Sequence, residues 1–550
     1  DWNNWVRETE GAMYWDGTQG CWWITLDGFD PDKEYRFQYR LGTGSGSDIY
    51  VSDPYTEIVY DQWNDQYIDG VPAFPEGAKA LVSAFQINRP EYAWQNKDFK
   101  VEDKNDLVIY EMLFRDFTTS QDIEGAMAQL DYIENLGVNA VQLMPVQEFD
   151  ANLSWGYNPN HWFALDKYYG TREEYKAFVD ECHERGMAVI IDVVYNHATG
   201  SHPWAKMWWS GSATAENNPF FNVTAKHEFN VYHDMNHENA LVKEHVKRSL
   251  EYLLTEYDVD GFRFDLTKGF TQNSGTEGCY DQSRVDYLKE YHAHIRSVDE
   301  DAVMICEHFV DDENYELGKD GMKVWRNMNH SFIKAQRGEM GEADFTGLTN
   351  TFNADGTMGG WQTFGQYVGY QESHDEERTG FEAQWTKDFA TRMERAKINA
   401  AFFLLAPGPK MIWQFGEIGY DISIEENGRT GEKPVKTAEY MAVPSRKGLY
   451  DTYSALLKFR KENPRFFDSD AEFRWYAGTS NFPGKYLFNK VDGKNMAIFA
   501  NFGKGDQVIS VELPHGGTWY NYFRKDEVWT GANHTPTLKE GEFVFLVDWK

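Results

Sequence analysis

The chain has 550 residues, and its 88 acidic side chains against 53 basic ones give a formal net charge of −35. A chain of this length is too long to fold around one ordinary hydrophobic core, so we expect several domains. The acidic balance disfavours nucleic acid and anionic membrane surfaces and leaves neutral polymers as partners. Aromatic residues make up 16% of the chain, and their flat apolar faces with polar edges suit sugar rings.

The first 95 residues carry strand signals. Tyr35, Phe37, Tyr39 and Leu41 alternate with charged or polar residues, a period of two that indicates a strand with one buried face. The pattern predicts an N-terminal β-sandwich over residues 1–95, which binds a ligand of its own or braces the next domain. No pair of exposed aromatic residues stands out in the sequence, so we favour bracing.

From Leu107 onwards, short apolar runs alternate with amphipathic helical stretches, which is typical of βα units around a parallel sheet. One helix is expected over 123–136, ending at Gly137, a second begins with a capping box of Thr171 and Glu174, and a third spans 447–461. The alternation predicts a (β/α)8 barrel within residues 96–465, with a small inserted domain at 198–240. Its strands are expected at 107–113, 140–144, 189–194, 261–265, 302–307, 324–327, 367–372 and 411–414.

After Pro464 the period returns to two, and Asp492-Gly493 separates two apolar runs as a hairpin turn. We expect a C-terminal β-sandwich over 466–550. Of the four cysteines, Cys182 lies on a core-facing helical stripe and Cys306 lies inside a predicted strand. Both are expected to be buried and unpaired.

Ionisable residues gather at the predicted strand ends, where a parallel barrel carries its catalytic groups. Alternation along strand 261–265 turns both phenylalanines towards the helices and Arg263 and Asp265 towards the interior. A cation beside Asp265 favours its ionised form. If Cys306 faces the helices, Glu307 faces the barrel mouth, where other carboxylates raise its pKa as a general acid requires. The residues at the ends of four strands are Asp192 to His197, Arg263 with Asp265, Glu307, and His374 with Asp375.

The segments DVVYNH, GFRFDL, ICEHF and ESHDEE resemble the four signature segments of the α-amylase family, in family order. Met144-Pro145-Val146 and the stretch from Trp155 to Pro159 resemble neopullulanases, pullulanases, isoamylases and branching enzymes. The resemblance covers about 107–461. The N-terminal sandwich, with Asp53-Pro54-Tyr55 late in it, resembles the β domains that precede the barrel in starch-debranching and branching enzymes, which implies that it binds glucan or braces the barrel. It implies a retaining glycosidase in which Asp265 is the nucleophile, Glu307 the acid/base and Asp375 the residue that stabilises the distorted sugar.

The same resemblance implies that the reacting glucose unit is bound by His197, Arg263 and His374, with Tyr157 stacked on it and Asp192 as support. Lys268 matches a lysine on the leaving-group side, although a solvated lysine explains it equally well. Many α-amylases have His at the next position, where this chain has Gly269. A structural calcium is implied at Asn196, Asp234 and the backbone of Gly269, which offer oxygen ligands. No organic cofactor is expected.

We therefore expect an enzyme that hydrolyses α-1,4 bonds inside starch, glycogen or maltodextrins. The alternatives are α-1,6 debranching, neopullulanase or cyclomaltodextrinase activity, and glucan branching; another is an inactive glucan-binding barrel. The longest apolar run, 400–406, is shorter than the roughly 20 residues of a membrane span. An extracytoplasmic location is expected because a polymer such as starch cannot enter a cell. The alternative is a cytoplasmic enzyme that acts on glycogen or on imported dextrins. The sequence leaves the oligomeric state open.

Overall fold

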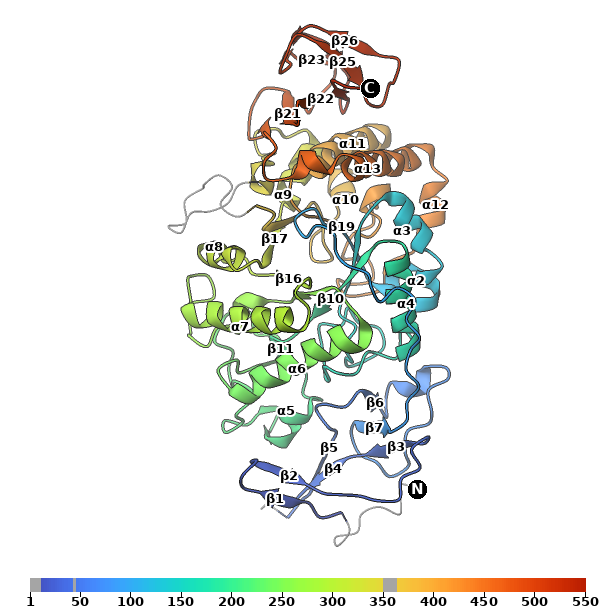
Figure 1. Cartoon of the computed structure of the whole chain (residues 1–550), viewed down its shortest axis with the longest axis vertical. Coiled ribbons are helices and arrows are strands. Elements are labelled where there is room, and N and C mark those ends of the chain that lie inside the picture. The colour runs from blue at the N-terminus through green and yellow to red at the C-terminus, as the bar shows by residue number, and fades with distance from the viewer. Residues whose placement is uncertain (1–10, 43–45, 350–363) are drawn as a thin grey trace.

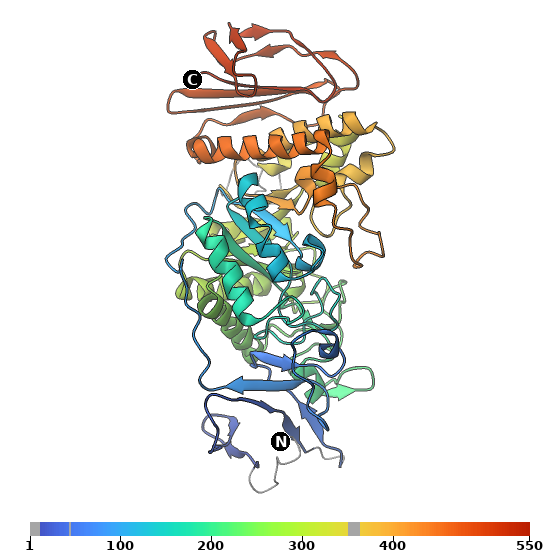
Figure 2. The same cartoon turned by 90° about the vertical axis from the view of Figure 1, so that its right-hand side faces the viewer.

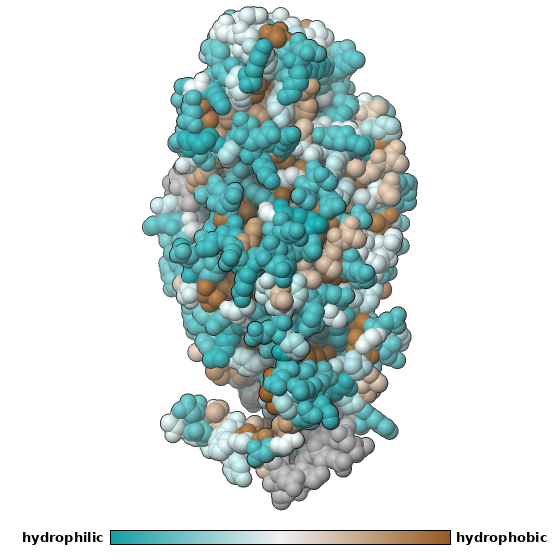
Figure 3. Space-filling model, turned by 45° about the vertical axis from the view of Figure 1, so that its right-hand side comes forward, coloured by the Kyte–Doolittle hydropathy of each residue, from teal (hydrophilic) through white to brown (hydrophobic). Residues whose placement is uncertain are grey.

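The computed structural model describes residues 11–42, 46–349 and 364–550. Along its long axis, N-terminal strands lie at one end, a barrel with its helices lies in the middle, and C-terminal strands lie at the other end (Figures 1 and 2). The face drawn in Figure 3 is mostly hydrophilic, with hydrophobic residues in small scattered groups. No helix of the described ranges is long and apolar enough to cross a membrane.

The centre of the molecule is a closed barrel of eight parallel strands. The predicted (β/α)8 barrel is confirmed, and each predicted strand is found with its ends shifted by no more than a few residues. The strands, in barrel order, are β8 (Val108–Met112), β9 (Ala140–Leu143), β10 (Ala188–Val193), β15 (Gly261–Phe264), β16 (Val303–Cys306), β17 (Lys323–Asn327), β18 (Tyr367–Tyr370) and β19 (Lys410–Trp413).

Helices connect the strands. The single helix expected over 123–136 is wrong in one respect, because it breaks between Met127 and Leu130. Its end at Gly137 is confirmed, since Gly137 has φ 100° and caps the last turn. The capping box of Thr171 is also confirmed. The helices are α1 (Phe114–Phe117), α2 (Ile123–Met127), α3 (Leu130–Leu136), α4 (Arg172–Glu184), α6 (Ala240–Tyr257), α7 (Gln282–Val298), α8 (Asp311–Lys319), α9 (Asn329–Arg337), α10 (Thr379–Ala383), α11 (Phe389–Leu404), α12 (Thr437–Met441) and α13 (Pro444–Glu462).

Alternate side chains of each barrel strand pack into two different apolar clusters, one between the strands and the helices and one inside the barrel. Phe262, Phe264 and Cys306 belong to the large cluster between strands and helices, whereas Val303 and Ile305 belong to the small cluster inside the barrel. The predicted orientation of the two phenylalanines and of Cys306 is therefore confirmed. Because successive side chains on a strand alternate, Arg263 points into the barrel.

The N-terminal strands form small sheets that contact the barrel loops. The strand expected over 34–41 is interrupted at Gln38, whose side chain donates to the Leu81 carbonyl at 2.8 Å. Asp65 pairs with Lys167 at 3.0 Å, and Ser52 Oγ lies 2.9 Å from His161 Nε2. These contacts join the N-terminal strands to the barrel. The ground for favouring bracing is wrong, however, because Trp15 and Trp22, which are paired in the first hairpin, are 54% and 62% exposed and their rings lie 5.5 Å apart. The strands are β1 (Tyr14–Asp16), β2 (Cys21–Trp23), β3 (Glu34–Phe37), β4 (Tyr39–Leu41), β5 (Ile49–Val51), β6 (Ile58–Tyr60) and β7 (Val82–Gln86); residues 1–10 lie outside the described ranges.

Between β10 and α6 the chain forms short elements beside the barrel: β11 (His197–Ala198), α5 (Pro203–Met207), β12 (Trp209–Ser210), β13 (Ala213–Thr214) and β14 (His233–Asp234). After α13 it forms a six-stranded antiparallel sheet and two strand pairs. The predicted hairpin at Asp492-Gly493 is confirmed, with positive φ at both residues. These strands are β20 (Arg474–Tyr476), β21 (Gly484–Val491), β22 (Lys494–Asn501), β23 (Gln507–Val508), β24 (Val511–Glu512), β25 (Thr518–Asn521), β26 (Val528–Thr530), β27 (Asn533–His534), β28 (Thr537–Leu538) and β29 (Phe543–Val547).

The four cysteines are free, and Cys182 and Cys306 are buried as expected. The C-terminal sheet packs on the last barrel helix through Phe459, whose ring lies 4.8 Å from Phe545 and 5.2 Å from Tyr522. Arg395 of α11 donates to the carbonyl of Phe502 at 2.8 Å. The barrel is thus held from both ends of the molecule.

Three buried histidines meet where the N-terminal strands, the insertion and the barrel join. His161 lies 6.4 Å from His202, and His202 lies 6.2 Å from His245, between ring centroids. Burial lowers the pKa of all three, that of His202 to about 3. Below pH 6.5 these histidines are therefore protonated in the unfolded chain but stay neutral in the folded one. The free energy of unfolding that they contribute above pH 6.5 is lost as the pH falls towards 3.

We predict that His202→Asn makes the protein less sensitive to acid. Asparagine keeps the cap on α5, where the His202 side chain accepts from Trp204 N, but it does not titrate. At pH 5, each such histidine costs about 2 kcal/mol, so the fall in unfolding free energy between pH 7.5 and 5 should shrink by about that amount. Urea titrations measure it. His330, with a side chain 70% exposed, is the control for His→Asn, and an equal fall in both variants contradicts the prediction.

Candidate functional site

The guanidinium group of Arg263 lies at the centre of the strand-end cluster. It projects from β15 and is fully buried. Nη1 donates to both carboxylate oxygens of Asp192, at 2.8 and 2.7 Å, and to Asp265 Oδ1 at 3.1 Å. Nη2 lies 2.9 Å from Glu307 Oε2. The rings of Trp325 and Tyr157 lie 4.1 and 5.8 Å from the guanidinium carbon. One cation therefore contacts carboxylates from three neighbouring strands.

The backbone after β15 orients the second acid. Leu266 has a positive φ of 45°, which is costly for a branched side chain. Its N–H donates to Glu307 Oε2 at 2.8 Å. Phe309 and Phe415, just after β16 and β19, also have positive φ, of 51° and 71°. Backbone strain thus gathers at the strand ends that surround the cluster, as it does at functional sites.

Burial raises the pKa of Asp265 and of Glu307 to about 7. Arg263 lowers both, and the charge of Asp375 raises both. Arg263 favours the ionised form of Asp265 as expected, but the expectation that it keeps Asp265 ionised is wrong, because desolvation outweighs the nearby cation. The expectation of a raised pKa for Glu307 is confirmed. The pair can therefore gain or release a proton near neutral pH.

His374 and Asp375 follow β18 and face the same cluster. His374 Nδ1 lies 2.8 Å from Glu111 Oε1, and its Nε2 lies 3.5 Å from Asp375 Oδ2. Burial lowers the pKa of His374, but Asp375 and Glu111 raise it to about 9. Burial raises the pKa of Asp375, yet His374, Arg263 and Arg429 hold it below its ordinary value. An imidazolium beside a carboxylate is the resulting state.

Tyr157 closes one side of the cluster. Its hydroxyl donates to Asp192 Oδ2 at 2.7 Å, and its ring stacks on His374 with centroids 5.1 Å apart. Gly156 permits this loop, because a Cβ there would lie 2.3 Å from the Pro145 carbonyl. His197 donates from Nε2 to the Tyr157 carbonyl at 2.9 Å, and burial lowers its pKa to about 4, so it is neutral.

Lys268 lies beyond Glu307. Its Nζ sits 3.8 Å from the centre of the Phe229 ring and 5.8 Å from that of Phe309. Burial lowers its pKa, which Glu307 opposes. Phe309 is 40% exposed. A cation thus lies between two aromatic faces, one from the insertion and one from the barrel, and faces of this kind suit the apolar side of a sugar ring.

The three predicted metal ligands lie together in a second cluster. A Cβ at Gly269 would lie 2.1 Å from Asn196 Oδ1 and 2.9 Å from His227 Nε2. His227 therefore occupies the space into which a side chain at position 269 would project. The carboxylate of Asp234 accepts hydrogen bonds from His227 and from Asn222, at 2.9 and 2.7 Å. Asn196 Oδ1 is buried without a hydrogen-bond partner. Oxygen ligands of this kind fit a hard cation.

Sequence reasoning missed Glu111, His227, Phe229, Phe309 and Arg429. Arg429, from the loop after β19, donates to the Asp375 carbonyl at 2.6 Å. Glu111 alone had a signal, as a charged residue within the otherwise apolar strand at 107–113. The others come from loops whose paths no local pattern shows.

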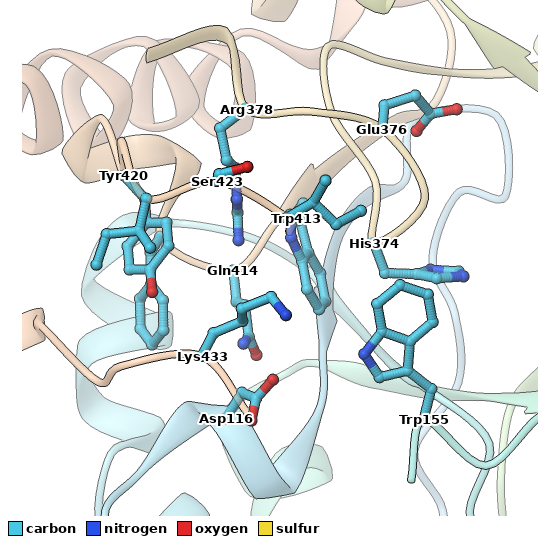
Figure 4. Close-up of a pocket in the computed structure, with 13 residues that line it drawn as sticks. Asp116, Trp155, His374, Glu376, Arg378, Trp413, Gln414, Tyr420, Ser423 and Lys433 are labelled. Carbon is cyan, nitrogen blue, oxygen red and sulfur yellow. The ribbon is translucent and has the colours of Figure 1, made fainter. Parts of the chain in front are cut away.

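A small cavity lies beside His374 at the strand ends, shown in Figure 4 with Trp155 and His374 on one side and Asp116, Gln414 and Lys433 on another. Its volume is about 20 Å³, which is the size of a water molecule. It is too small for a sugar ring.

Comparison with known proteins identifies the barrel. The family profile "Alpha amylase, catalytic domain" matches residues 108–230 and 209–447. Malto-oligosyltrehalose trehalohydrolase of Saccharolobus solfataricus is 26% identical over 402 residues, 68% of this chain and 66% of that protein. Isoamylase SU1 of Zea mays is 34% identical over 276 residues, 43% of this chain and 34% of that protein. The chain thus spans between a third and two thirds of these relatives.

A solved structure shares the fold over nearly the whole chain. The pullulanase from Anoxybacillus sp. LM18-11, solved with maltotriose, superimposes with a TM-score of 0.71 at 18% identity. The alignment covers 98% of this chain and 80% of that one. The N- and C-terminal strand regions are therefore part of a shared architecture.

Proposed function

Because this chain belongs to the alpha-amylase family, we propose that it is a retaining glycoside hydrolase that cleaves α-1,4 bonds inside starch-like glucans. The supporting observation is the Arg263 guanidinium, which contacts Asp265 at 3.1 Å and Glu307 at 2.9 Å. Two carboxyl groups on one cation are close enough to act on one bond. Retention calls for two carboxyl groups roughly 5 to 5.5 Å apart.

In the first step, the Asp265 carboxylate attacks the anomeric carbon while the proton of Glu307 passes to the leaving oxygen. A covalent glycosyl ester forms and the glycosidic bond breaks. In the second step, the Glu307 carboxylate takes a proton from water, which attacks the same carbon and frees Asp265. Both groups return to their starting state.

The surrounding residues have distinct tasks in this scheme. Asp375 and His374 hold ring hydroxyls of the reacting glucose, and Tyr157 stacks on its face. Asp192 anchors Arg263, and His197 holds the Tyr157 backbone. Lys268 with its two phenylalanine neighbours faces the leaving chain. The active form has Asp265 ionised and Glu307 protonated, which raised pKa values near 7 allow around neutrality.

We predict that Asp265→Ala lowers hydrolysis of amylose at least about a thousandfold, because no carboxylate remains to form the ester. Glucan binding should persist, since the stacking and hydroxyl-binding groups stay in place. Reducing-sugar release measures the first, and affinity electrophoresis in amylose gels measures the second. Asp312→Ala, an exposed acid on α8, is the control. Unchanged hydrolysis by Asp265→Ala would refute the assignment.

A second candidate is cleavage of α-1,6 branch points. The similarity to isoamylase SU1 of Zea mays, 34% identical over 43% of this chain, favours it, as do Phe264-Asp265-Leu266 and Met144-Pro145-Val146. Both candidates use the same two acids and differ in the loops that admit the chain. Glucan branching, cyclomaltodextrin hydrolysis and a catalytically inactive binding role remain the further alternatives.

We predict that the protein releases short maltooligosaccharides from amylose and acts more slowly on pullulan. Lys268, Phe229 and Phe309 together form an aromatic surface on the leaving-group side, which suits a linear chain. Chromatography of the products measures both reactions. Release of only maltotriose from pullulan, with amylose untouched, replaces the α-1,4 proposal by the α-1,6 one.

An extracytoplasmic location stays a prediction that rests on polymer size.

We also propose one structural Ca²⁺ held by Asn196 Oδ1, the Asp234 carboxylate and the Gly269 carbonyl. The support is the buried Asn196 Oδ1 atom without a hydrogen-bond partner beside a buried carboxylate. A cation there would tie the insertion to the end of β10.

We predict one calcium per chain by elemental analysis, and a lower melting temperature after chelation. A ligand at a hundred times its Kd stabilises the folded state by about 2.7 kcal/mol. Asp234→Asn keeps the shape of the side chain but removes its charge, so both signals should disappear. Asp312→Asn serves as the control. Absence of calcium, together with no chelation effect, contradicts the proposal.

A further inference from the structure

Glu111 is a buried carboxylate that no step above uses. It projects from β8 into the barrel with no exposed surface. In the strand register, Gln142 of β9 and Trp413 of β19 are its neighbours. Its Oε1 accepts from His374 Nδ1 at 2.8 Å and from Gln142 Nε2 at 3.3 Å. Its Oε2 has no hydrogen-bond partner. A buried carboxylate of this kind is costly unless a cation faces it.

We propose that Glu111 is a positioning residue for the glycosidase reaction: it holds His374 as an imidazolium whose Nε2–H points at Asp375 and the reacting sugar. This inference rests on the proposed function, which gives that sugar a place beside His374. Glu111 touches neither the sugar nor the reacting atoms. It acts only through the ring.

The geometry fixes the ring in one orientation. With Nδ1–H donated to Glu111, only Nε2 is left to face Asp375, at 3.5 Å from Oδ2. Tyr157 stacks on the ring at 5.1 Å, and Trp155 meets it edge-on at 5.4 Å. Figure 4 shows His374 beside the Trp155 ring, with Trp413 nearby. The stacked Tyr157 ring and the edge-on Trp155 ring restrict rotation of the imidazole.

Charges around the ring favour its protonated form. Glu111 faces it from β8, Asp192 from β10, Asp265 from the end of β15, and Asp375 and Glu376 from its own loop; Arg263 is the cation that opposes them. Burial alone lowers the pKa of His374, and Asp375 with Glu111 reverses this and raises it to about 9. The imidazolium in turn lowers the pKa of Asp375. Glu111 therefore stabilises the Asp375 anion indirectly, through the positive charge on His374.

The contribution of His374 to activity should depend on pH. His374 has a raised pKa, so its charge is present below about 9 and is lost as the pH rises through that value. Removal of the Glu111 charge should move this loss to lower pH. In Glu111→Gln the amide oxygen still accepts from Nδ1–H, so the ring keeps its place while the charge is gone.

The test is the pH profile of kcat/KM on a soluble maltooligosaccharide for Glu111→Gln. We expect the part of the basic limb that His374 sets, above the pH at which Glu307 loses its proton, to move down by at least one pH unit, which is about a threefold loss at pH 8.5 and about an eightfold loss at pH 9.5 relative to the wild type. At pH 6 the two enzymes should differ by less than about threefold. The matched control is Glu417→Gln, another fully buried acid of this barrel, which is bonded to Tyr110 at 3.1 Å. Its basic limb should stay in place.

A uniform loss of activity at all pH values, with an unmoved basic limb, overturns the proposal, because that is the result of lost packing alone. A second measurement needs no folded variant at position 111. Nitrogen NMR of the wild-type histidine side chains, with His374→Gln for assignment, should show His374 protonated at pH 8. A neutral His374 at pH 7 also overturns the proposal. This readout needs no substrate, so it stays decisive if the protein hydrolyses no glucan.

Discussion

The structure depends on one buried cation in contact with three buried carboxylates. Arg263 contacts Asp192, Asp265 and Glu307 inside the barrel. Without the guanidinium, three acids at the ends of adjacent strands would lie buried and unpaired, which costs several kcal/mol per charge. With it, they lie side by side around one positive charge. The planar guanidinium has donors in a fixed geometry, so it sets their spacing as well as their charge.

A second charged chain, through Glu111, His374 and Asp375, runs beside the first. It begins inside the barrel and ends at the mouth, where Arg429 contacts the Asp375 carbonyl. The two chains meet electrostatically, because Arg263 lowers the pKa of Asp375 and opposes protonation of His374. The barrel strands carry both chains, and Leu266 after β15, whose φ is positive, donates its backbone N–H to Glu307. Charge distribution and backbone strain therefore serve the same few atoms.

The loops decide what can reach those atoms. The insertion after β10 contributes His227 and Phe229, which lie beside Gly269 and Lys268. The N-terminal strands contact the loops after β9 through Asp65 and Lys167. These contacts join the N-terminal strands to the loops after β9 and do not involve the acids of the strand-end cluster. Members of one family can thus share a centre and differ in the bonds they cleave.

Local patterns in the sequence were sufficient for the strands, for the orientation of Phe262 and Phe264, and for the placement of Asp265, Glu307 and Asp375 at strand ends. Alternation and caps depend on residues a few positions apart, so they can be read along the chain. Only the tertiary structure showed that burial outweighs Arg263 in raising the pKa of Asp265. It alone brought together Glu111 and His374, which lie 263 positions apart. Desolvation and contacts between distant strands depend on how the barrel closes, and no local pattern contains that information.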